Sequence, residues 1–66
     1  MITVTTESGY RVALRTRVAG ETAYAEIAGY IVRNVLSPWY VIKSFESEHL
    51  AERFLTTLVA ALRGEL

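Results

Sequence analysis

Six side chains of this sequence carry the chemistry of a binding surface. They are three arginines and three aromatic residues, namely Arg11, Arg15, Arg17, Tyr24, Tyr30 and Trp39. Because arginine contacts phosphate groups and aromatic rings stack on bases, a flat sheet that carries both could bind single-stranded nucleic acid. Tyrosine and arginine are also enriched in protein interfaces. The third interpretation is a solvated surface with ion pairs and cation–π pairs between strands.

Enzyme and metal chemistry have little support among the residue types. The chain has no Asp and no Cys, and His49 is its only histidine. Zinc sites need clusters of Cys or His. The neighbouring acids Glu46, Glu48 and Glu52 are typical of a helix start, where negative charge suits the positive end of the helix. We therefore expect no enzyme activity and no catalytic, cofactor-binding or metal-binding residues.

One long β-hairpin is expected to position the arginines and tyrosines. Residues 10–19 and 22–33 alternate in side-chain character as paired strands do, and Gly20-Glu21 fits a two-residue type II′ turn. Counting outward from this turn predicts the facing pairs Ala19–Thr22, Arg17–Tyr24, Arg15–Glu26, Leu14–Ile27 and Arg11–Tyr30. Each pair is chemically compatible, which supports the register.

The remaining elements are two strands and a helix. Residues 1–6 and 39–45 are rich in β-branched and aromatic residues, and residues 47–63 carry an apolar stripe at helical spacing after Ser47, a good N-cap. The chain, 1–66, is thus expected to be a single small α+β domain. Its fold is a four-stranded antiparallel β-meander followed by one C-terminal α-helix packed on one sheet face. The residues expected under the helix are Tyr10, Val12, Leu14, Ala25 and Ile27.

The length of the hairpin poses a geometric question. Thirteen residues of strand span about 43 Å, whereas a compact chain of this size is roughly 28 Å across. Either a bend or bulge at Gly29 or a second subunit would resolve the difference. The aromatic residues of strand 39–45 occupy both of its faces, which leaves apolar surface open and also favours association.

Charge and hydropathy limit the binding partners and the cellular location that we expect. Seven basic residues balance seven glutamates, so the chain is not an obvious polyanion binder. No apolar run reaches the roughly 20 residues that span a bilayer, and no secretory signal pattern is present. With no cysteine in the sequence, we expect a cytoplasmic protein without membrane contacts.

These observations lead to two functional hypotheses. The first is a small non-catalytic protein-binding module (adaptor, regulator or stoichiometric inhibitor) that acts as a homodimer and contacts an unidentified partner protein. Phage and other accessory proteins are often of this size. The alternative is a single-stranded nucleic-acid-binding protein that uses the arginines and rings of the hairpin. Its β-β-β-β-α order is similar to that of the dimeric single-strand-binding domains of some transcriptional coactivators.

Overall fold

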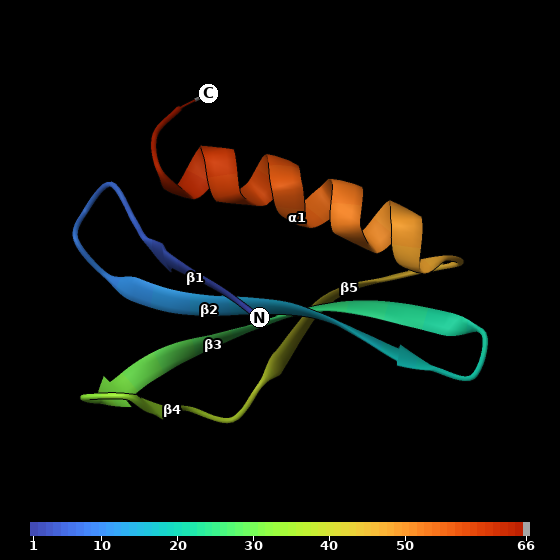
Figure 1. Cartoon of the computed structure of the whole chain (residues 1–66), viewed down its shortest axis with the longest axis horizontal. Helices are drawn as coiled ribbons and strands as arrows, with labels where there is room; N and C mark the ends of the chain where they lie inside the picture. Colours follow the sequence, from blue (N-terminus) through green and yellow to red (C-terminus); the bar gives the residue numbers. More distant parts are fainter. Residues whose placement is uncertain (66) are drawn as a thin grey trace.

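The computed structural model describes residues 1–65 and shows an antiparallel sheet with one helix packed across it (Figure 1). The elements are β1 (Ile2–Thr5), β2 (Arg11–Ala19), β3 (Thr22–Val32), β4 (Val35–Leu36), β5 (Tyr40–Phe45) and α1 (Glu48–Leu62). The predicted α+β fold, an antiparallel meander followed by a C-terminal helix, is confirmed.

The central hairpin follows the predicted register. Gly20 has a φ of 61° and Glu21 has no positive φ, a combination that identifies the type II′ turn. Strands β2 and β3 pair from Ala19–Thr22 to Val12–Gly29, and this ladder includes Arg17–Tyr24, Arg15–Glu26 and Leu14–Ile27. Strand β1 pairs with β2 on one side, and both β4 and β5 pair with β3 on the other.

Two irregularities lie where the sequence did not indicate them. Of the alternatives that the sequence left open, a bulge at Gly29 in the β2–β3 ladder does not form, because Val12 and Gly29 pair in an unbroken register. The extra residues are instead Ile31, between β3 and β4, and Ile42, between β3 and β5. The segment expected to be only a connection contains β4, which pairs with β3 around a turn whose Asn34 has a φ of 60°. The chain therefore reverses its direction at Asn34, before it reaches Pro38.

The helix begins and ends at the residues that its caps require. The Leu50 N–H donates to the Ser47 side chain at 3.3 Å, and Glu48 lies in the first turn. At the other end, Gly64 has a φ of 74°, which suits a glycine after the last helical turn. Glu7 N–H donates to the Leu62 carbonyl at 2.8 Å, so the turn after β1 is attached to the end of the helix.

The hydrophobic core lies between α1 and one face of the sheet. Val4, Leu14, Ala25 and Leu55 are buried there, and the larger side chains around them are Val12, Ile27, Phe45, Phe54, Leu58, Val59 and Leu62. Tyr10 does not belong to this face as expected, because it precedes β2 in a turn and is 72% exposed. The molecule measures 34 × 28 × 14 Å and is therefore flatter and longer than a compact globule of this size. The 11-residue β3 lies along its longest dimension, so the length of the hairpin does not by itself require a second subunit.

Candidate binding surface opposite the helix

All six predicted binding residues lie on the sheet face that α1 leaves uncovered. Odd-numbered residues of β2 and even-numbered residues of β3 point to this face, since their neighbours in sequence point to the helix. Trp39 joins them because it lies two residues before Val41, which pairs with Glu26. We call this surface the arginine–aromatic face: Arg11, Arg15, Arg17, Tyr24, Tyr30 and Trp39, arranged around Glu26.

Each arginine on this face stacks on one aromatic ring. The guanidinium carbon is 4.1 Å from the ring centre in the Arg11–Tyr30 pair and 4.5 Å in the Arg17–Tyr24 pair. Arg15 stacks on Trp39 at 4.1 Å. The planar guanidinium is well suited to such contacts, which attract the cation to the ring face. One side of each ring is therefore already occupied within the chain.

Glu26 connects two of these stacks. Arg15 Nε donates to Glu26 Oε1 at 2.8 Å, and Arg17 Nε donates to Oε2 at 3.0 Å. The glutamate residue is only 3% exposed. Burial by itself raises the pKa of the Glu26 carboxyl, but the hydrogen bonds and charges of the two arginines outweigh it and hold the pKa below its ordinary value. Glu26 is thus a charged anchor of the face.

Tyr30 connects the central strand β3 to the edge strand β1. Its hydroxyl lies 3.2 Å from the Thr3 hydroxyl, so a residue of β3 reaches across β2 to β1. The hydrogen bond from Thr3, followed by the influence of nearby Arg11, lowers the pKa of the Tyr30 phenol despite an opposing effect of burial. This contact fixes the ring on which Arg11 stacks.

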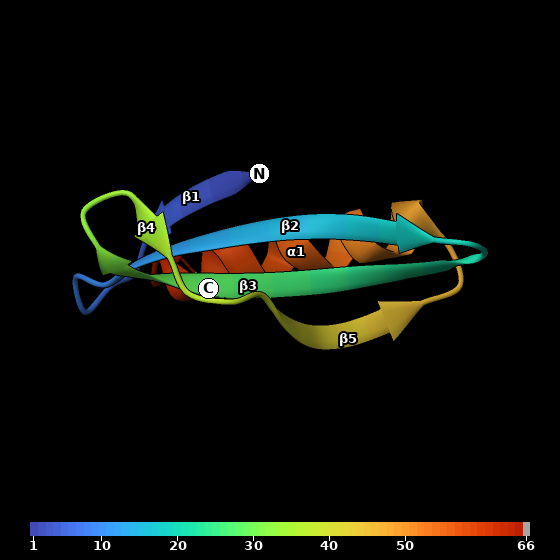
Figure 2. The same cartoon turned by 90° about the horizontal axis from the view of Figure 1, so that it is seen from below.

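Two alanines lie beneath the stacked side chains. Ala13 stands between Arg11 and Arg15 on β2, its partner Ala28 stands between Glu26 and Tyr30 on β3, and both alanines are buried. The β3–β4 hairpin curls to the same side, away from the helix, so that this end of the sheet is covered on both faces (Figures 1 and 2). The arginine–aromatic face is therefore a layer of stacked side chains that is still partly open to solvent.

The sequence prediction missed the central role of one residue and one contact. Glu26 was paired with Arg15 but not counted among the binding residues, although its place between two arginines on the predicted ladder was the available signal. The Arg15–Trp39 stack had no local signal, because Trp39 comes from beyond the turn at Asn34 and its direction depends on the irregular β5 pairing.

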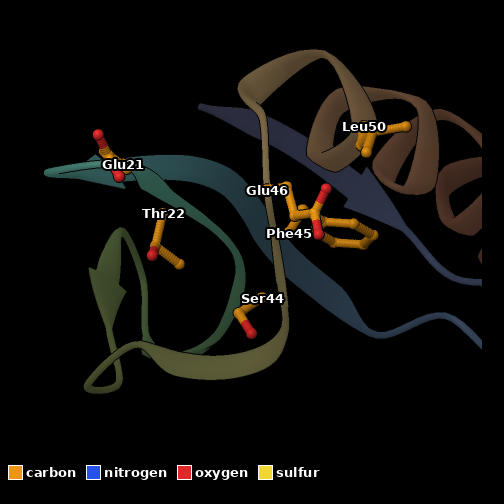
Figure 3. Close-up of a pocket in the computed structure, with 6 residues that line it drawn as sticks. All are labelled: Glu21, Thr22, Ser44, Phe45, Glu46 and Leu50. Carbon is orange, nitrogen blue, oxygen red and sulfur yellow. The ribbon is translucent and has the colours of Figure 1, made fainter.

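Other polar residues in the described part of the chain lie apart from the arginine–aromatic face. His49 is exposed at the start of α1. Within residues 1–65, no group of three or more His, Cys, Asp or Glu side chains is placed to hold a metal ion. A wide, open hollow lies between the hairpin tip, the end of β5 and the helix start, lined by Glu21, Thr22, Ser44, Phe45, Glu46 and Leu50 (Figure 3). Its polar groups do not converge on a common point, as those of a substrate pocket do.

Comparisons with known proteins add no identity. No family model matches the chain, and no curated protein or solved structure matches it. Over the part of the chain that the structure describes, no helix is long and apolar enough to cross a membrane.

Proposed function

We propose that this chain is a small non-catalytic protein-binding module that acts as a homodimer through one border of its sheet. The observation that carries the proposal is a group of exposed apolar side chains on β5 and on the β3–β4 hairpin that precedes it. We call this group the outer border: Ile31, Val32, Val35, Tyr40, Val41 and Ile42, which are between 39% and 64% exposed. Exposed apolar residues gathered in one region of a small domain are typical of an interaction site.

The arginine–aromatic face supports the same choice by a different route. Arg15 and Arg17 are bound to Glu26, and all three arginines lie on rings of their own chain. A partner that used these groups would first have to displace the internal contacts. A partner that binds the side chains of the outer border would displace only water and would not have to break contacts within the chain.

The outer border favours contact through side chains over pairing of backbones. Pro38 precedes β5, the extra residue Ile42 interrupts its ladder with β3, and Lys43 follows. Prolines, bulges and lysines are the features that prevent an edge strand from pairing with another chain. We therefore expect a symmetric dimer in which the apolar side chains of two outer borders pack together.

The test compares two valines that are equally exposed on opposite borders of the sheet. Val41 and Val18 are each 52% exposed. Val41→Lys places a charge on both copies of the interface and is expected to raise the dimer dissociation constant by about 100-fold, because two buried valines are lost. Val18→Lys on β2 should leave the constant unchanged. Light scattering and sedimentation over a concentration series measure both.

Two results would contradict the proposal. One is a wild-type protein that is monomeric at high micromolar concentration. The other is a dimer that Val18→Lys dissociates and Val41→Lys does not, since this would place the interface on the opposite border.

Single-stranded nucleic-acid binding remains the second candidate, favoured by the excess of positive charge on the arginine–aromatic face. Arg11 stacks on Tyr30 and has no ion-pair partner in residues 1–65, so it is the arginine most available to a phosphate. Titration with labelled oligonucleotides at two salt concentrations tests this role. Binding should weaken steeply with salt, and Arg11→Gln should reduce the salt slope by about one. A slope that Arg11→Gln leaves unchanged would exclude this face.

A further inference from the structure

We infer that the free half of strand β2 accepts an extended segment of a partner protein as an added β-strand, with a basic side chain directed to Glu48 and Glu52. The inference rests on the proposed protein-binding function and adds a second place of contact, on the border opposite the dimer surface. It follows from the backbone of β2, the hollow beside it and the charge at its rim.

Strand β1 covers only part of β2. Its four residues pair with β2 from Arg11 to Leu14, whereas β2 continues to Ala19 (Figure 2). Beyond Leu14, within the described chain, no strand pairs with β2 on this side. The outer edge of β2 is therefore open from Arg15 to Ala19, which is about half of the length of the strand.

The register shows which backbone groups face this open edge. The pair that closes a two-residue turn exchanges both of its hydrogen bonds, so Ala19 and the other odd-numbered residues of β2 bond to β3. Even-numbered residues bond to the opposite side, as the Thr6 N–H to Tyr10 carbonyl bond of 2.7 Å shows. The N–H and C=O groups of Thr16 and Val18 consequently point outward. They form a regular edge without a bulge or proline, in contrast to β5.

A hollow lies between this edge and the first turns of α1. Leu14 and Leu55 line it, Met1 and Ile2 are at one end, Arg15 and Thr16 are on the strand, and Glu48, Glu52 and Thr56 are on the helix. Arg15 does not neutralise the two helix carboxylates, because its guanidinium is bound to Glu26 on the opposite face of the sheet. A residue added opposite Thr16 would share the sheet face of Thr16 and point into the hollow. The site thus offers backbone hydrogen bonds together with one specific side-chain position.

Charge decides which side chain suits that position. Glu48 and Glu52 are one helical turn apart and exposed, and neither forms an ion pair in residues 1–65. An arginine or lysine opposite Thr16 would lay its aliphatic stem over the leucines and place its charge at the two carboxylates. A second copy of this chain does not supply such a group through β2 itself, because Thr16 and Val18 are the β2 residues that point to the helix side.

The test uses a synthetic peptide with the expected alternation, acetyl-Thr-Ser-Val-Thr-Arg-amide, in which Val faces Val18 and Arg faces Thr16. A control peptide replaces Arg with Glu. Nuclear magnetic resonance of the full chain should show exchange of the Thr16 and Val18 amide protons slowed about tenfold or more at saturating peptide. The Arg peptide should bind at least about tenfold more tightly than the Glu peptide.

Two variants separate the contributions. Val18→Pro removes an outward N–H without breaking the ladder to β3 and should abolish peptide binding, with its spectrum confirming the fold. The double change Glu48→Gln and Glu52→Gln should remove the preference for Arg over Glu. The matched change Glu21→Gln and Glu46→Gln, which removes the same charge from exposed residues outside this hollow, should retain that preference.

The outcomes distinguish this inference from the proposed dimer. Absence of protection at Thr16 and Val18 with either peptide overturns strand addition, whereas light scattering on the same samples reports the dimer independently. Protection that increases with protein concentration in the absence of peptide would identify a second copy as the occupant and would also overturn the inference.

Discussion

The two faces of the sheet are built on the same strands but are stabilised in different ways. On the helix side, aliphatic and aromatic side chains from β1, β2, β3, β5 and α1 pack against one another. On the opposite side, three arginines stack on three rings around the buried carboxylate of Glu26. The first layer depends on excluding water, and the second depends on direction and charge.

The difference shows how a small domain can use both faces of a sheet with a single helix. Apolar burial on one side alone leaves a chain of this size only marginally stable. The arginine–aromatic face adds a second layer whose charged groups keep contact with water, since the Arg15 and Arg17 side chains are 37% and 42% exposed. Such a layer is expected to contribute less stability than the core and to respond to pH.

The largest effect is expected on the helix side. Leu14 is fully buried, so Leu14→Ala should lower the free energy of unfolding by about 2–5 kcal/mol, through lost burial and the cavity that remains. Because small domains have total stabilities of only about 5 kcal/mol, much of the variant would be unfolded. Urea denaturation measures the change. Leu50→Ala, on the exposed side of the helix start, is the matched control and should change stability far less.

A smaller effect is expected at Glu26. Glu26→Gln keeps the shape of the side chain but replaces two charge-assisted hydrogen bonds, and should lower the free energy of unfolding by about 1–3 kcal/mol. Glu21→Gln at the exposed hairpin tip is the control, with an expected change within about 0.5 kcal/mol. Equal stability of the two variants would show that the arginine–aromatic face is not a stabilising layer.

The contribution of Glu26 to stability should also depend on pH. Because the folded pKa of Glu26 lies below its unfolded value of 4.5, its contribution is complete above that pH and is lost as pH falls through the folded pKa. The difference in unfolding free energy between the wild type and Glu26→Gln should therefore be constant near neutral pH and shrink in acid. A difference that is independent of pH, or that grows in acid, would contradict the charged state of Glu26.

The smallest effect is expected at the Arg15–Trp39 stack. Trp39→Leu keeps apolar bulk over the face but removes the ring quadrupole, with an expected loss of about 0.5–1 kcal/mol. A double-mutant cycle with Arg15→Gln isolates the pair, since the two changes should be non-additive by about this amount. Full additivity would mean that the observed stacking contributes nothing to stability.

The hairpin and its contacts were predictable because a two-residue turn fixes everything that follows it. Gly20 and Glu21 set the register, and the register placed Arg15 opposite Glu26 and Arg17 opposite Tyr24. The direction of Trp39 was not predictable, because the extra residue Ile42 changes the alternation of β5. Phe45 therefore faces the helix while Trp39 faces the opposite side, although both have odd numbers.

By itself, the sequence determined the four longer strands and the helix in their order, the central turn, the helix caps and the gathering of arginines and tyrosines on one face of the hairpin. These features depend on residues close together in the chain or directly opposite each other in a hairpin. Tertiary structure decided that β4 forms, that Glu26 is buried between two arginines, and that Trp39 lies over Arg15. Those outcomes depend on how distant segments compete for the same strand edges and faces, which no local pattern records.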